Sequence, residues 1–280
     1  MWRQVFSLTV RELKHWYRVK IQIFFTLIQP IVWLGLFGQA FNIGSLFENP
    51  AIPAGAQGAV FSQFFAGAPD YFSFMSVGML AVITLFTCMF SGMSIVWDRR
   101  FGFLNKLKVA PIARGVVPLS RMMATVVRAM IQAILVFGIA LAFLYVPGLV
   151  GLTLKPTFDL MDLMGMFLVL FLLSVGFSAL FTTIALGVEN QETLFGIINL
   201  LNLPLMFASA TLFPTTLMPD WLQTVADYNP LTWASDALRQ FTFDNPTPIY
   251  SLPVDLLALG LFSGALVGAS IILSRWLLNK

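Results

Sequence analysis

The residue types that most often do chemistry in proteins are few in this sequence, and they stand far apart. Among 280 residues there is one histidine, His15, and one cysteine, Cys88. A metal site needs several ligands brought together, so neither residue predicts one. A single cysteine makes no disulfide within the chain, and Cys88 lies in an apolar run, where a small packed side chain is expected.

The sequence also lacks a loop that could cradle a phosphate. The pattern Gly-x-x-x-x-Gly-Lys-Ser/Thr is missing, and so is the dipeptide Gly-Lys itself. Two pairs of acids occur, Asp159 with Asp162 and Glu189 with Glu192, without a histidine beside either pair. We expect the first pair to be solvated loop charges and the second pair to bracket a short turn. These observations predict that the chain is not an enzyme and binds no cofactor of its own.

The elements that hold these residues are too apolar for a water-soluble protein. Hydrophobic residues make up 58% of the chain and charged residues only 10%, whereas soluble domains have about 45–50% and about 25%. A transmembrane helix needs about 20 mostly apolar residues, and six stretches without Asp, Glu, Lys or Arg are long enough. We predict an all-α integral membrane protein with one domain, 1–280, and six transmembrane helices near 21–43, 72–97, 121–146, 163–188, 193–213 and 254–274.

Glycine and proline refine this assignment at two places. The segment 49–69 is free of charge until its end but contains three prolines and three glycines, so we predict a loop or an interfacial segment there. On the last predicted span, Gly260, Gly264 and Gly268 repeat every four residues. Such spacing favours close helix contact, either within the subunit, which we favour, or between subunits.

The positions of the basic residues fix the direction of the spans. With six spans, 14 of the 16 Lys and Arg residues fall on the side of the two termini, and only Lys155 and Arg239 fall on the other side. Cytoplasmic loops are enriched in Lys and Arg. We therefore predict a multi-pass protein of the cell membrane, either plasma or inner, with both termini in the cytoplasm.

Two cytoplasmic segments have both apolar and basic faces. On a helix, residues 1–20 gather Trp2, Val5, Phe6, Leu13 and Trp16 on one face and basic residues opposite, which predicts an amphipathic helix at the membrane surface. The loop 97–114 combines apolar anchors with cations and ends at a Pro-x-x-Arg sequence. It predicts a short helix that docks in a groove of another protein or lies on the membrane.

Three segments of the sequence are similar to the ABC-2-type permeases, the membrane-spanning subunits of ATP-binding-cassette exporters. In the loop 97–114, an Asp-Arg-Arg triplet, a glycine, two leucines and the ending Pro-Ile-Ala-Arg resemble the cytoplasmic segment of that family. The stretch 203–222 resembles its fifth span leading into a proline-rich element, and the Asn-Pro…Ala-Leu-Arg stretch at 229–239 resembles the segment before its last span.

The resemblance implies roles for two sets of residues. The loop would be a coupling helix that contacts an ATPase, through Arg99, Arg100, Phe101, Gly102, Leu104, Lys106 and Leu107. An extracellular re-entrant element before the last span would contain Pro214, Pro219, Trp221, Asn229, Pro230, Asp236 and Arg239. Asp236 and Arg239 are spaced to pair at the outer rim, where such a pair contributes about 0–1 kcal/mol.

The resemblance also implies the partners. These are two separate ABC ATPase subunits, which would bind ATP and Mg, and a second permease subunit in a homodimer or heterodimer. Membrane lipid surrounds the spans, and no nucleic acid is expected. We predict export of an amphipathic or hydrophobic substrate such as a drug, lipid or glycolipid. Two alternatives stay open: an ion-coupled secondary transporter, and a membrane enzyme of lipid metabolism, which would need clustered His and acids.

Overall fold

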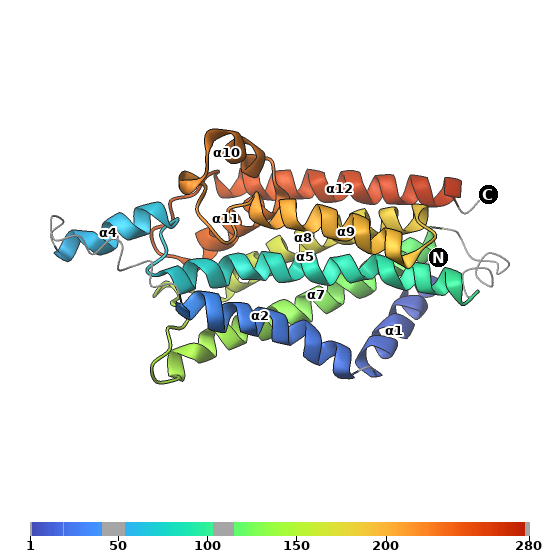
Figure 1. Cartoon of the computed structure of the whole chain (residues 1–280), viewed down its shortest axis with the longest axis horizontal. Helices are drawn as coiled ribbons and strands as arrows, with labels where there is room; N and C mark the ends of the chain where they lie inside the picture. Colours follow the sequence, from blue (N-terminus) through green and yellow to red (C-terminus); the bar gives the residue numbers. More distant parts are fainter. Residues whose placement is uncertain (1, 19, 41–53, 103–114, 278–280) are drawn as a thin grey trace.

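The computed structural model describes residues 2–18, 20–40, 54–102 and 115–277, and every regular element in these ranges is a helix. The long helices run side by side along one axis of a bundle (Figure 1). The helices are α1 (Trp2–Arg18), α2 (Lys20–Ala40), α4 (Ala54–Phe64), α5 (Tyr71–Arg100), α7 (Val116–Ala142), α8 (Leu160–Gly187), α9 (Gln191–Phe207), α10 (Asp220–Asp227), α11 (Pro230–Thr242) and α12 (Leu252–Leu277), with short 3-10 turns at η1 (Phe143–Tyr145) and η2 (Thr215–Leu217).

Four helices in the described ranges are long and apolar enough to cross a membrane. They are Tyr71–Arg100, Val116–Tyr145, Leu160–Gly187 and Leu252–Ser274. The prediction of an all-helical membrane protein is confirmed at this level. The other two predicted spans coincide with α2, of 21 residues, and α9, of 17 residues, so the six-span arrangement itself stays a prediction.

The two ends of the bundle differ. The amphipathic helix α1, the end of α5 and the C-terminal end of α12 lie together at one end, and α4 lies at the other (Figure 1). Helix α4 has 11 residues, about 16 Å of helix, which is too short to cross a hydrocarbon core of about 30 Å. After α4 the chain turns at Gly67, whose φ is 82°, and Asp70 caps the start of α5 by accepting hydrogen bonds from Ser73 N (2.8 Å) and Ser73 Oγ (2.9 Å).

Helix α5 is the central element, because it packs against α2, α7, α8, α9 and α11. Its buried side chains include Phe72, Phe74 and Leu80. Two glycines let other backbones approach it closely. A Cβ on Gly78 would overlap the carbonyl of Thr211, and a Cβ on Gly92 would lie 2.7 Å from the carbonyl oxygen of Phe181. Small residues at such crossings permit the close contacts that hold helices together in lipid.

The glycine repeat of α12 faces open space within this subunit. A Cβ on Gly260, Gly264 or Gly268 would meet no described atom within 4 Å. Helix α12 packs against α8 through another face, where the buried Ser263 donates a hydrogen bond to the carbonyl of Leu172 (2.6 Å). The preference for glycine contacts inside the subunit is therefore wrong for the residues that the structure describes.

Candidate functional site

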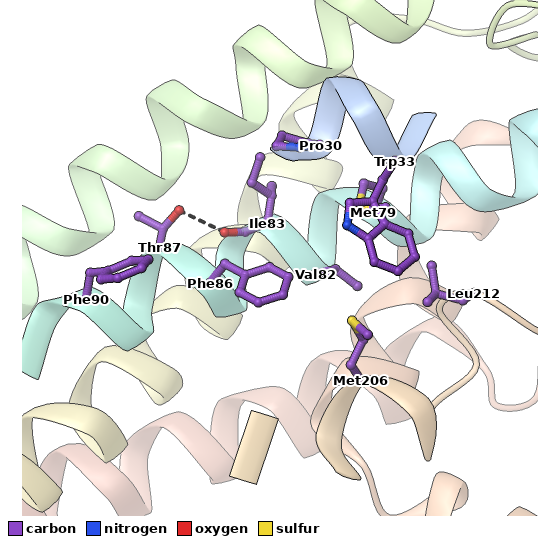
Figure 2. A pocket seen from close by; sticks show the side chains of 10 residues that line it. All are labelled: Pro30, Trp33, Met79, Val82, Ile83, Phe86, Thr87, Phe90, Met206 and Leu212. Atoms are coloured by element: carbon purple, nitrogen blue, oxygen red, sulfur yellow. Dashed lines mark hydrogen bonds between the residues drawn. The ribbon is translucent and has the colours of Figure 1, made fainter. Parts of the chain in front are cut away.

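An apolar groove lies between α2, α5 and α9 (Figure 2). Helix α5 provides most of its wall, with side chains spaced three or four residues apart so that they share one face. The enclosed volume is about 20 Å³, hardly more than one water molecule requires. The lining residues are Pro30, Trp33, Met79, Val82, Ile83, Phe86, Thr87, Phe90, Met206 and Leu212.

The groove offers dispersion contacts and almost no polar ones. Its one hydroxyl, on Thr87, donates to the carbonyl of Ile83 (2.8 Å) and also contacts Gln132, so it is already occupied. Figure 2 shows Pro30 and Trp33 on α2 facing the α5 side chains, with Met206 on α9 across from them. A proline also lies inside each of the two flanking helices, Pro30 in α2 and Pro204 in α9. The sequence did not reveal this groove, because helices that are apolar on every side show no distinct face.

The predicted coupling residues divide between a helix end and a turn. Arg99 and Arg100 are the last residues of α5, which runs three residues beyond the predicted span, so they do not begin a separate loop helix. Arg99 donates to the carbonyls of Leu186 (2.9 Å) and Val188 (2.8 Å). It thereby satisfies free carbonyls at the end of α8.

Beyond α5, the chain leaves the helix with apolar surface exposed. Phe101 has 80% of its surface exposed, and Gly102 has a φ of 70°, a left-handed conformation that glycine adopts without strain. Leu104, Lys106 and Leu107, with the rest of residues 103–114, lie outside the described residues. The structure therefore brings Arg99 to α8 and leaves Arg100 and Phe101 exposed at the cytoplasmic end predicted for the bundle.

A buried charge network joins three helices at this end, and the sequence analysis did not predict it. Arg121, only 4% exposed, pairs with Glu12 on α1 and with Asp98 on α5. Arg11 approaches the same two carboxylates at 4.0 and 3.8 Å. A signal was present in the sequence, since Glu12 is the one acid in the predicted amphipathic helix. The network fixes α1 to both helices that flank the loop 103–114.

In the predicted extracellular element before the last span, Asn229 caps the start of α11. Asn229 accepts a hydrogen bond from Leu231 N (3.0 Å) and donates to the carbonyls of Leu205 (2.7 Å) and Ala208 (2.6 Å). Pro230 follows as the first residue of the helix, where its missing N–H leaves no helical hydrogen bond unmade. The Asn-Pro pair therefore begins α11 and at the same time ties it to the end of α9.

Asp236 and Arg239 are buried, which corrects the predicted pair at the exposed rim. Their exposed fractions are 1% and 2%. Arg239 donates to the carbonyls of Phe74 (3.3 Å) and Thr211 (3.1 Å), and its guanidinium lies 3.6 Å from the centre of the Phe74 ring. The physical reason is that the turn after α9 leaves the Thr211 carbonyl inside the bundle, where it needs a donor.

Asp236 has different partners. It accepts hydrogen bonds from Ile249 N (2.8 Å) and Tyr250 N (2.9 Å), in the segment between α11 and α12. Burial raises the pKa of Asp236, and these two backbone donors act against that effect. Asp236 therefore holds the connection to α12 in place.

Of the remaining predicted outer residues, Pro214 is buried three residues after Thr211, and Pro219 is exposed. Pro214 and Pro219 precede η2 and α10, respectively, and Trp221 is 69% exposed.

The two acids at the start of α8 make specific hydrogen bonds and an ion pair, whereas solvated loop charges were expected. Asp159 and Asp162 form a capping box, and Asp162 pairs with Lys155 at 2.7 Å.

Comparison with known proteins shows the family of the chain. The family described as ABC-2 type transporter matches residues 3–243. The transport permease ycf38 of Cyanophora paradoxa is 30% identical over 89% of this chain and 77% of its own length, and that of Porphyra purpurea is 30% identical over 76% and 65%.

A more distant relative carries a more specific name. DrrC of Mycobacterium tuberculosis, named as a doxorubicin resistance ABC transporter permease protein, is 25% identical over 56% of this chain and 53% of its own length. The chain thus spans from about half to about three quarters of these proteins. Because the family match covers most of the sequence and its helices are those of a multi-pass membrane protein, the chain belongs to the ABC-2 type transporter family of transport permeases.

Proposed function

We propose that this chain is the permease subunit of an ABC exporter that moves an amphipathic or hydrophobic molecule, such as a drug, lipid or glycolipid, out of the cell. Two separate ATPase subunits would bind Mg and ATP and hydrolyse the ATP. Within this family, the observation that carries the proposal is the apolar groove between α2, α5 and α9. Such a lining favours an apolar molecule taken from the bilayer over a hydrated ion.

The relatives support the substrate class. One is named for doxorubicin resistance, and another, DrrB1 of Streptomyces coeruleorubidus, for daunorubicin resistance. DrrB1 is 23% identical over 65% of this chain and 62% of its own length.

Helix α5 supplies a route for coupling. One face of it lines the groove, and its last turn leads directly into the loop 103–114. In the proposed mechanism an ATPase holds this loop through Phe101 and Leu104. Closure of two ATPases would then displace the end of α5, while Arg99 and Arg121 carry the movement to α8 and α1. The coupling works only if the permease binds its ATPase differently in its two states.

The assembly that we propose has two permease subunits, identical or closely related, with their termini in the cytoplasm beside the ATPases. The open glycine face of α12 supports a second subunit or lipid on that side, since described atoms of this chain do not cover it. The alternative, an ion-coupled secondary transporter, would move substrate without any ATPase.

The test is transport with and without the ATPase. The chain is reconstituted in vesicles, alone and with a candidate ABC ATPase partner, and movement of a fluorescent amphipathic drug is followed. We expect movement only with both proteins and ATP. Phe101→Asp together with Leu104→Asp should abolish it and release ATP hydrolysis from control by the permease, because charges replace the apolar anchors.

The control is Tyr145→Asp, which places one such charge on another exposed aromatic residue, at the opposite end of α7. It should insert and transport as the wild type does. Normal transport by the loop variant would contradict the docking role of the loop. Accumulation by the chain alone on a proton gradient would favour the ion-coupled alternative.

A further inference from the structure

A second cavity, of about 170 Å³, lies between α1, α5 and α7 at the end of the bundle that carries Phe101. Its lining is mixed, with basic and acidic side chains on one side and Phe90, Met93 and Trp97 of α5 on the other. The proposed function makes no use of this cavity. Its chemistry differs from that of the apolar groove, because charged groups face a space large enough for a small polar group.

The charges around the cavity do not balance. Three guanidinium groups and two carboxylates line it, in addition to His15. Arg121 and Arg11 lie against both carboxylates, those of Glu12 and Asp98. One positive charge is thus left over when His15 is neutral, and it belongs to the third arginine, Arg128.

Arg128 is held toward the cavity with an unused donor. Its Nε donates to the carbonyl of Ala124, one turn earlier in α7, at 3.3 Å. Its Nη2 is buried and has no hydrogen-bond partner among the described residues. A buried donor without an acceptor is costly, more so when it carries a charge. The site therefore lacks one anionic or strongly polar oxygen.

The cavity and the apolar groove meet at one residue. Phe90 lines both, and the α5 face that forms the groove, from Met79 through Phe86, continues past Phe90 to Trp97 in the cavity wall. Figure 2 shows Phe90 at the end of the row of groove residues on α5. A molecule with a charged oxygen at Arg128 can therefore lay its apolar part along this face of α5 toward the groove, which must widen beyond its volume of about 20 Å³ to admit it.

We propose that this cavity binds the headgroup of a membrane amphiphile with a single negative charge on oxygen, such as a phosphodiester, and that its apolar part lies along α5. The inference deepens the proposed function, on which it rests for the step from binding to transport. The exported molecule would then be an anionic amphiphile, and it would reach the cavity from the leaflet beside α1. Arg128 is the residue that selects the charge.

The test measures binding without ATPase or ATP. The full chain is placed in nanodiscs of phosphatidylcholine, and phosphatidylglycerol or phosphatidylcholine with brominated chains is added in increasing proportion. Bromine quenches tryptophan fluorescence, and Trp33 lines the groove toward which the brominated chains would extend, while Trp16 and Trp97 line the cavity. We expect saturable quenching by phosphatidylglycerol at a lower proportion than by phosphatidylcholine. Arg128→Gln should raise the half-saturating proportion about tenfold, since it removes a charged donor.

The matched control is Arg3→Gln, which removes the same charge from an exposed position of α1. It should leave the quenching curve unchanged, and Arg128→Lys should restore most of the preference. Equal quenching by the two lipids in the wild-type chain would overturn the proposal, even if Arg128→Gln failed to fold. Equal losses in Arg3→Gln and Arg128→Gln would overturn it too, because the preference would then come from general surface charge.

Further outcomes distinguish a lipid anion from a free anion, and failure of the binding-site proposal from failure of the exporter proposal. Inorganic phosphate at millimolar concentration should not displace phosphatidylglycerol, and displacement would show a site for free anions instead of an amphiphile. If phosphatidylglycerol binds as expected but ATP and the ATPase fail to move it, the exporter proposal fails and the binding site stands. If drug transport works but the lipid preference is missing, only the binding site fails.

Discussion

At the scale of single residues, buried polar side chains of this protein donate hydrogen bonds to backbone carbonyls that the helices leave without a donor. Arg239 donates to two carbonyls from segments far apart in the chain, those of Phe74 and Thr211. Asn229 does the same for Leu205 and Ala208. In a bilayer no water replaces such donors. These side chains therefore stabilise the irregular backbone between α9 and α11.

Removing Arg239 tests this role. Arg239→Leu keeps a similar apolar bulk but leaves the carbonyls of Phe74 and Thr211 without a donor. We expect the free energy of unfolding to fall by about 2–3 kcal/mol. The measurement is a denaturation curve in mixed detergent. Arg3→Leu, at an exposed position, should change the value by less than about 0.5 kcal/mol, and equal curves for the two variants would contradict the assignment.

A second residue prediction concerns Gly78, where a Cβ would overlap the Thr211 carbonyl. Gly78→Ala should lower the free energy of unfolding by about 1–3 kcal/mol, because α5 must move away from the turn. Gly138→Ala is the matched change in α7, where a Cβ meets no described atom within 4 Å. It should leave stability unchanged or raise it by up to about 1 kcal/mol through helix propensity. The same loss at both positions would show that the close approach is unimportant.

At the scale of the elements, α1 is tied to the bundle by charge as well as by apolar packing. Val5 and Trp16 are buried against the bundle, and Glu12 lies between them on the same face. Helix α1 packs against α7 and α2, and the Arg121 network adds a link to the end of α5. This helix is thus packed into the end of the bundle that carries Phe101 rather than held as a loose surface anchor.

Loss of the Arg121 network should loosen α1 first. Arg121→Gln leaves Glu12 and Asp98 buried without their main partner, so we expect amide hydrogen exchange in residues 2–18 to become about tenfold faster, with little change in α8. Arg11→Gln is the comparison, because Arg11 approaches the same acids from an exposed position, where a pair contributes about 0–1 kcal/mol. Unchanged exchange in Arg121→Gln would mean that apolar packing alone holds α1.

The helices could be predicted from the sequence more fully than the site. Charge-free stretches long enough for a bilayer predicted ranges that overlap α5, α7, α8 and α12, because the bilayer forces backbone groups into helices. The burial of Arg239 could not be predicted, since its partners are carbonyls of residues far away in the chain. The groove and the Arg121 network likewise depend on which faces of apolar helices meet, and that information is absent from local periodicity.

At the scale of the whole molecule, the distribution of charge predicts the orientation. In the proposed arrangement Arg3 and Tyr145 lie on opposite sides of the membrane. Cys88 is fully buried, so in a Cys88→Ala background a single new cysteine reports its own side. We expect a membrane-impermeant maleimide to label Tyr145→Cys in intact cells, and to label Arg3→Cys only after the membrane is permeabilised. The reverse pattern would contradict cytoplasmic termini.

The prolines of α2 and α9 have a consequence for selectivity. Each removes one backbone hydrogen bond within its helix, whereas α5 between them contains no proline. The two flanking helices can thus bend away from α5 with little disruption of the backbone. Widening of the groove is then opposed mainly by the exposure of its apolar surface, which costs about 25 cal/mol per Å². A bound molecule that covers the exposed apolar surface of the groove offsets the free energy of widening, whatever its detailed shape. Discrimination along the groove would then follow the area of the guest's apolar surface more than the details of its shape.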